Sequence, residues 1–162
     1  MNYQAPSGRI IVWFTFIVSL ILQVMPLPEV VKVWRPDWLL LTMICWAIYL
    51  PHRYGVITAF ALGVVLDILL GATIGVRALA FSITIYLVML YQQRLINFPR
   101  WKQSLIVFVM MIVYHSIVYW VELILGETEF SIALFYPALS GIMFWRWAYW
   151  MIRRIAQRYR VS

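Results

Sequence analysis

Six long apolar segments constrain this chain more strongly than any motif in it. They run over about residues 10–25, 34–50, 54–70, 76–91, 105–125 and 132–152. A helix of about 20 apolar residues crosses the hydrocarbon core of a bilayer with its backbone hydrogen bonds satisfied internally. The segments do not alternate between apolar and polar residues as the strands of an outer-membrane barrel do. The sequence therefore predicts an all-α integral membrane protein, a single polytopic domain over residues 1–162 with six transmembrane helices in one bundle.

The composition excludes an ordinary soluble domain. Hydrophobic residues make up 65% of the chain and charged residues 12%, whereas a soluble domain carries about 25% charged residues to cover its surface. The segment over 34–50 is short for a complete crossing, and only Pro51, His52 and Arg53 separate it from the next. The first segment is expected to be a retained helix rather than a cleaved signal peptide, because a Pro-Leu-Pro sequence follows it instead of small residues.

The distribution of Lys and Arg predicts the orientation. Basic residues favour the cytoplasmic side of a membrane protein, and with six spans both termini fall on the more basic side. Both termini are therefore expected to be cytoplasmic. The basic residues on that side are Arg9, Arg53, Arg94, Arg100, Lys102, Arg153, Arg154, Arg158 and Arg160, and those on the other side are Lys32, Arg35 and Arg77.

The basic C-terminal tail is expected to lie at the membrane surface. Arg153, Arg154, Arg158 and Arg160 are predicted to contact anionic lipid headgroups, with an acidic cytoplasmic partner as the alternative. Arg146 lies inside the last apolar segment and is expected to extend toward the same phosphates. The net charge of +7 does not indicate nucleic-acid binding, because no soluble face is long enough to carry a basic stripe.

Three ionisable residues inside or at the ends of apolar segments require a reason, since charge in hydrocarbon is costly. Asp67, Arg77 and Glu122 fall at similar depths near the outer ends of their segments. An Asp67–Arg77 pair is predicted, with Glu122 or Arg35 close enough to join it. Two interpretations stay open: a structural polar cluster that fastens a helical turn, or a cluster that faces a partner or ligand.

The spacing of a further group of polar residues favours contacts between helices. His115, Tyr119 and Glu122 follow i, i+4 and i+7 and share one helix face, which fits a polar seam between helices or, alternatively, a proton relay.

Glycines recur at four-residue spacing around Asp67. Gly63 and Gly71 are expected to permit close helix packing. Gly71 and Gly75 predict a tight outer turn, because glycine tolerates positive φ.

No catalytic or metal-binding motif is found in the sequence. There is no Gly-x-Ser-x-Gly, no His-Glu-x-x-His and no phosphate-binding loop ending in Gly-Lys-Ser or Gly-Lys-Thr. His52 and His115 are far apart, and no ligand spacing accompanies them. Cys45 is the only cysteine, so no intramolecular disulfide can form. The chain is expected to be no enzyme and to need no metal or cofactor.

Several short patterns resemble those of a known family. They are Arg35-Pro36-Asp37 before an apolar helix, Pro51-His52-Arg53 after it, the stretch from Gly63 to Gly71, the sequence Gly75-Val76-Arg77, and Gln23-x-Met25-Pro26 at the end of the first helix. Together with the length and the short basic tails, they resemble MreD, the family of bacterial rod shape-determining membrane proteins. The resemblance is most specific over residues 35–80.

The resemblance implies a role that the residues alone do not. Members of the family act in the machinery that inserts peptidoglycan along the side wall. They bind MreC directly and are linked through that complex to MreB, to RodA and to the partner transpeptidase of RodA. The resemblance also implies the bacterial inner membrane and a fold similar to the substrate-binding subunits of energy-coupling-factor transporters.

The expected function is a non-catalytic membrane scaffold of the cell-elongation complex, which binds MreC; self-association is a further expectation. The alternative is a carrier-like module for a lipid or small molecule, with Asp67, His115, Tyr119 and Glu122 lining one cavity. An intramembrane enzyme is a third class, but no nucleophile and base are paired in the sequence.

Overall fold

The computed structural model describes residues 6–28, 34–126 and 136–158. Within these ranges the chain is all-helical, with six helices and no strand, which confirms the expected all-α class and the number of helices. That the six helices cross a membrane stays a prediction. The helices are α1 (Pro6–Val24), α3 (Trp38–Tyr49), α4 (Val56–Leu70), α5 (Val76–Asn97), α6 (Arg100–Leu125) and α7 (Tyr136–Arg158).

The helix ends differ from the expected ones where polar residues continue a helix or a proline stops it. Helix α3 begins at Trp38 rather than near residue 34, because Pro36 lies just before it and restricts the preceding backbone. Helices α5 and α6 run through the polar residues beside Pro99, so that α5 reaches Asn97 and α6 begins at Arg100. Helix α7 extends past residue 152 to Arg158, and the expected first residues of that segment, 132–135, lie outside the described residues.

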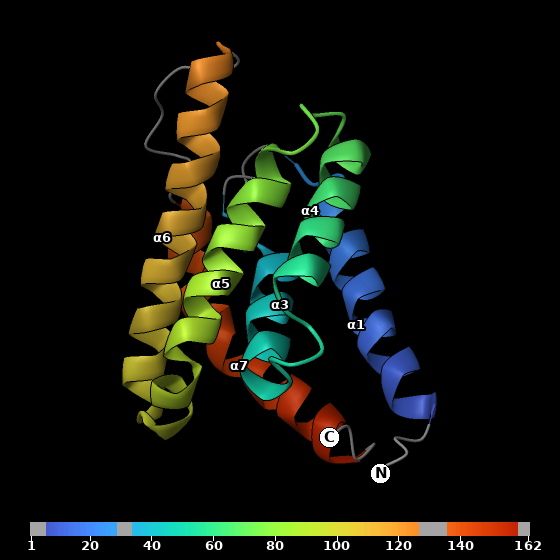
Figure 1. Cartoon of the computed structure of the whole chain (residues 1–162), viewed down its shortest axis with the longest axis vertical. Helices are drawn as coiled ribbons and strands as arrows, with labels where there is room; N and C mark the ends of the chain where they lie inside the picture. The colour runs from blue at the N-terminus through green and yellow to red at the C-terminus, as the bar shows by residue number, and fades with distance from the viewer. Residues whose placement is uncertain (1–5, 29–33, 127–135, 159–162) are drawn as a thin grey trace.

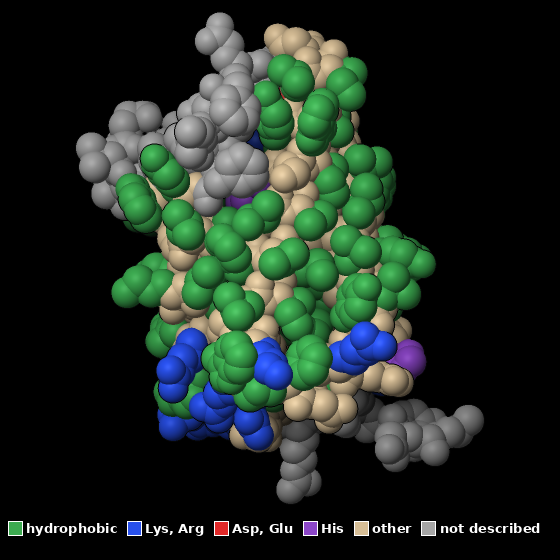
Figure 2. Space-filling view, turned by 90° about the vertical axis from the view of Figure 1, so that its left-hand side faces the viewer, with side chains coloured by type: hydrophobic (Ala, Val, Ile, Leu, Met, Phe, Trp, Pro, Cys, Tyr) green, Lys and Arg blue, Asp and Glu red, His purple; other side chains and the backbone are tan. Residues whose placement is uncertain are grey.

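Successive long helices run in opposite directions, so the two termini lie at the same end of the bundle (Figure 1). The α3–α4 and α5–α6 connections lie at that end, which we call the basic end, and the α4–α5 turn lies at the opposite end (Figure 1). Figure 2 shows lysine and arginine side chains gathered at the basic end, below an apolar surface. The described basic residues at the ends of elements that meet there are Arg9, Arg53, Arg94, Arg100, Lys102, Arg153, Arg154 and Arg158.

Helix α3 forms the centre of the bundle. All ten residues from Leu39 to Ile48 are buried, and α3 packs against α1, α5 and α7. Its contact with α1 includes two side-chain hydrogen bonds, from the Trp46 indole N–H to Thr15 at 3.0 Å and between Ser19 and Thr42 at 2.6 Å. With 12 residues α3 is about 18 Å long, which is shorter than the hydrocarbon core of a bilayer.

The outer faces of the remaining helices carry large apolar side chains. Among the most exposed are Ile10 on α1, Ile57 on α4, Leu90 on α5, Ile124 on α6 and Met143 on α7. Apolar side chains cover most of the face in Figure 2 above the basic end. Helices α5 and α6 are long and apolar enough to cross a membrane, by length and composition. An apolar surface of this extent needs a non-aqueous neighbour.

The backbones of α4 and α5 approach closely at Gly63. A Cβ added at Gly63 would lie 2.4 Å from the Cα of Ala78, so only glycine fits there. Gly71 ends α4 with φ 63°, and Gly75 precedes α5 with φ 103°, while an added Cβ at either would meet nothing within 4 Å. These two glycines therefore provide the positive φ of the turn, and Gly63 provides the close approach.

A candidate functional site: the polar network opposite the termini

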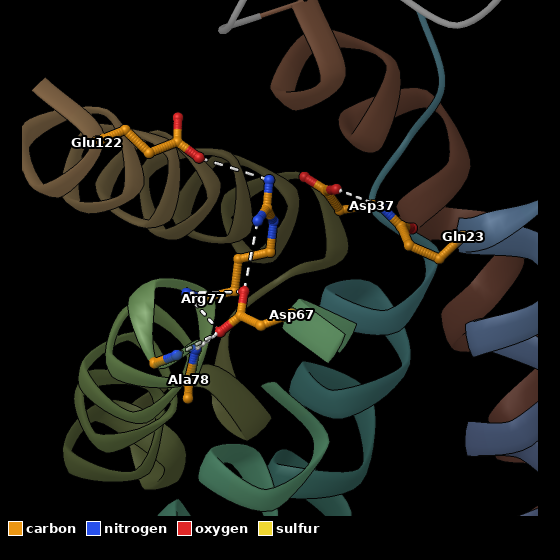
Figure 3. A network of polar contacts seen from close by, with 7 residues as sticks. Gln23, Asp37, Asp67, Arg77, Ala78 and Glu122 are labelled. Atoms are coloured by element: carbon orange, nitrogen blue, oxygen red, sulfur yellow. Dashed lines mark hydrogen bonds and ion pairs between the residues drawn. The ribbon is translucent and has the colours of Figure 1, made fainter. Parts of the chain in front are cut away.

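The side chain of Asp67 is the centre of a buried polar network near the α4–α5 turn. It is fully buried in the last turn of α4, and its carboxylate points at the first turn of α5 (Figure 3). It accepts hydrogen bonds from the backbone N–H groups of Gly75 at 2.9 Å, Arg77 at 3.2 Å and Ala78 at 3.4 Å. The residue before α5, Gly75, has no side chain to cap these groups. Asp67 therefore caps α5 from a neighbouring helix, where the helix dipole also favours a negative charge.

The Arg77 guanidinium joins this carboxylate to α6. Its Nη1 lies 3.4 Å from Asp67 Oδ1, and its Nη2 lies 3.5 Å from Glu122 Oε1. Figure 3 shows the guanidinium between the two carboxylates. One arginine thus connects acidic residues from two different helices, and the side chains of Asp67, Arg77 and Glu122 lie together at this end.

A second part of the network joins α1 to the start of α3. The Gln23 side-chain amide donates to Asp37 Oδ1 at 2.9 Å, and its carbonyl oxygen accepts the backbone N–H of Trp38 at 3.0 Å. Asp37 does not cap its own helix. Gln23 caps α3 instead, and this hydrogen bond fixes the end of α1 to the first turn of α3.

Asp37 also meets α6 through His115. The Nε2 atom of His115 lies 2.7 Å from Asp37 Oδ2, and both side chains are almost buried. Neither atom has another hydrogen-bond partner in the described part of the chain, so a proton on Nε2 is needed to satisfy both of them. The positive charge of Arg77 also acts on the Asp37 carboxylate, which lies beside it in Figure 3. The two parts of the network are therefore electrostatically continuous.

The complete network joins five helices toward the end of the bundle opposite the termini. Gln23 belongs to α1, Asp37 precedes α3, Asp67 ends α4, Arg77 begins α5, and His115 and Glu122 lie on α6. Three carboxylates face one arginine and one histidine, and backbone N–H groups supply further positive partial charge. Buried charges that are paired and hydrogen-bonded in this way hold their neighbours in a fixed arrangement.

Two residues predicted for this region are placed differently from the rest. Arg35 donates to the backbone carbonyl of Met25 at 2.9 Å. This hydrogen bond fixes the chain after α1 and does not involve the acidic side chains of the network. The Tyr119 ring lies 6.3 Å from that of Trp120 in an edge-on arrangement and is half-buried. His115 and Glu122 share a face of α6 as the spacing predicts, but they contact different partners, Asp37 and Arg77.

The arginines predicted to contact headgroups lie at or toward the other end of the molecule. Arg146, Arg153, Arg154 and Arg158 are all exposed on α7, and Arg160 lies outside the described residues. The Arg154 guanidinium lies 3.9 Å from the centre of the Trp150 ring, a cation–π contact that holds it against the helix. These residues are not part of the polar network.

Sequence reasoning missed Gln23 and Asp37 as members of the network. Asp37 directly follows Pro36, and Gln23 lies three residues before Pro26. At such a junction of two apolar segments a polar residue is ordinarily assigned to a solvated loop. The available signal was the position of Asp37, because Asp directly before an apolar helical run is a common helix start. The partner on α1 could not be read from the sequence, since it depends on how α1 packs against α3.

The acidic and histidine side chains of the polar network line neither of two cavities in the part of the chain that the structure describes. In the described ranges, no group of three or more His, Cys, Asp or Glu side chains is arranged to hold a metal ion. The cavities found at the basic end and beside α1 are lined by other residues. The carboxylates instead make contacts between helices, as expected of a structural network.

Comparison with known proteins gives a consistent result. A family model described as "rod shape-determining protein MreD" matches residues 6–155. A curated protein named rod shape-determining protein MreD, from Haemophilus influenzae, is 28% identical over 156 residues, which cover 94% of this chain and 96% of that protein. No solved structure matches.

Proposed function

Because the chain belongs to the MreD family of rod shape-determining proteins, we propose that it is a non-catalytic membrane scaffold of the cell-elongation complex. In this role it binds MreC directly in the bacterial inner membrane. Through MreC it associates with MreB, RodA and the partner transpeptidase, and so helps to organise side-wall peptidoglycan synthesis. The polar network is the observation that carries the proposal: its ionisable groups join helices to one another, which makes a rigid body rather than a reaction site.

The proposed membrane placement has both termini in the cytoplasm. Three features support it: the termini share the basic end, the outer faces are apolar, and the basic side chains gather at that end (Figures 1 and 2). The positive-inside rule then puts the polar network on the outer side of the membrane. In this placement α3 lies within the bundle without facing lipid, so its short length needs no thinning of the bilayer.

A groove between α1 and α7 is the proposed binding site for the single transmembrane helix of MreC. It has a volume of about 620 Å³ and is lined mainly by apolar side chains of α1, α3 and α7, among them Phe14, Val18, Trp147 and Met151. Thr15, Ser19 and Thr42 form its small polar part. A single apolar helix could pack its side chains into such a groove, and small hydroxyl residues allow close approach.

Cysteine cross-linking tests this binding site. Cys45 is the only native cysteine and is buried, so cross-links are expected to arise from the introduced cysteine and not from Cys45. Phe14→Cys and Met151→Cys are expected to cross-link to cysteines along the MreC helix. Leu90→Cys is the matched control, because Leu90 is also exposed but lies on α5. Equal cross-linking from all three positions would count against the groove.

Co-purification tests the scaffold itself. The full-length chain, expressed at its native level with the cell's own MreC, is isolated in mild detergent and the mass of the intact complex is measured. A defined stoichiometry of the two proteins is expected, and the same mass reveals any self-association. Recovery of this chain without MreC, with bound lipid or small molecule only, would favour the carrier-like alternative instead.

A further inference from the structure

We propose that the basic end carries a binding site for an anionic phospholipid with two phosphate groups, in a cavity between the start of α6 and the second half of α7. This site is separate from the polar network, shares only Trp147 with the groove assigned to MreC, and does not depend on that partner. The cavity has a volume of about 910 Å³, within the range of small-molecule binding pockets.

The charge of the cavity is entirely positive. Four arginines line it, namely Arg100 on α6 and Arg146, Arg153 and Arg154 on α7, and no Asp or Glu lines it. All four side chains are exposed, and in the described part of the chain none of them forms an ion pair with a carboxylate. A group of unpaired guanidinium ions on adjacent helices repels itself, so a polyanionic ligand would stabilise the arrangement.

The arginines are arranged along the helix rather than at one level. Arg146 and Arg153 are seven residues apart on α7, which puts them on the same face and about 10 Å apart along the axis. In the proposed membrane placement Arg146 therefore lies deeper than Arg153. A ligand with one phosphate could meet only part of this series, whereas two linked phosphates could meet both levels.

Aromatic and polar side chains complete a site for a lipid rather than for a soluble anion. Trp147 and Trp150 line the cavity and are about half exposed, as expected of tryptophan at a membrane interface. Met143 lines its deeper end and is 81% exposed, where an acyl chain would lie. Trp150 packs against Arg154, which orients that guanidinium before any ligand binds.

Lipid titration followed by native mass spectrometry tests the site. The purified full-length chain is titrated in detergent with cardiolipin, which has two phosphates, and with phosphatidylglycerol, which has one. One tightly held cardiolipin per chain is expected, with phosphatidylglycerol binding more weakly. The double variant R146Q/R153Q is expected to lower the cardiolipin affinity about tenfold or more, because each basic residue near a phosphate contributes measurably to binding.

The matched control is R9Q/R94Q, which removes the same charge at the same end from two exposed arginines that do not line the cavity. It is expected to change the affinity about threefold at most. Equal losses in the two double variants, or no preference for cardiolipin, would overturn the proposal. So would displacement of the lipid by millimolar pyrophosphate, because a soluble anion would then be the ligand.

Thermal unfolding of each variant separates lost binding from lost folding. If R146Q/R153Q does not fold, R146K/R153K decides, since lysine keeps the charge but loses the forked geometry of guanidinium. A severalfold loss of cardiolipin affinity supports the site, and an unchanged affinity overturns recognition by guanidinium groups. Recovery of MreC with any of these variants tests the scaffold function separately.

Discussion

At the scale of single residues, the acidic side chain of Asp67 is bound mainly by backbone N–H groups and only secondarily by Arg77. Its nearest partner is the Gly75 N–H at 2.9 Å, and the Arg77 guanidinium lies at 3.4 Å. The sequence predicted the pairing from the similar depth of the two residues near the outer ends of their apolar segments. It could not predict the helix cap, because that depends on the direction in which α5 leaves the turn.

Two substitutions of Asp67 should therefore lower the stability by different amounts. Asp67→Leu removes every acceptor, so that three backbone N–H groups lose this partner and Arg77 keeps only its ion pair with Glu122. A loss of about 3–5 kcal/mol is expected. Asp67→Asn keeps one acceptor oxygen and should lose about 1–2 kcal/mol, as other cap substitutions do. Unfolding of the purified variants in detergent measures both. Equal effects of the two variants would argue against a capping role.

The His115–Asp37 contact makes a second prediction at this scale. His115→Leu removes the ring nitrogen that lies 2.7 Å from the buried Asp37 Oδ2, and a loss of about 1–3 kcal/mol is expected. His52→Leu is the natural control, since His52 is the other histidine and is exposed. Comparable melting temperatures for the two variants would contradict a structural role for His115.

At the scale of helices, sequence patterns predicted the number of helices better than the residues at which they end or the neighbours against which they pack. Each of the six apolar segments corresponds to one helix. A long apolar run predicts a helix well, because its length matches that of a membrane-spanning helix. The central place of α3 could not be predicted, since its composition resembles that of its neighbours and only packing distinguishes them. The likeness to energy-coupling-factor subunits stays a prediction, because no solved structure matches.

The contact of α4 with α5 yields a prediction about glycine. Gly63→Ala places a Cβ 2.4 Å from the backbone of α5, which cannot move without displacing the helix, so a loss of about 3 kcal/mol is expected. Gly141→Ala is the matched control on α7. Its Cβ would meet only the end of the Met111 side chain, and methionine can adapt to a new neighbour. Expression level and melting temperature distinguish the two, and equal tolerance would exclude close packing at Gly63.

At the scale of the whole molecule, the shared end of the two termini and the gathered basic residues lead to a topology prediction. A membrane-impermeant maleimide should label Ala72→Cys, in the α4–α5 turn, in intact spheroplasts. Arg9→Cys, at the basic end, should react only after permeabilisation. Buried Cys45 should give little background labelling. The reverse pattern would invert the proposed orientation and put the arginine-lined cavity on the outer leaflet.

The enclosed position of α3 has a consequence for how the protein is made. A 12-residue helix is too short to remain in the bilayer as a stable span by itself, and it is sheltered only when α1, α5 and α7 surround it. Helix α7 leaves the ribosome last among the described helices, so in the proposed membrane placement the centre of the bundle stays open to lipid during most of synthesis. Insertion therefore cannot proceed simply one helix at a time. A nascent chain stalled before α7 should remain sensitive to membrane proteases and require an insertase or chaperone to hold it.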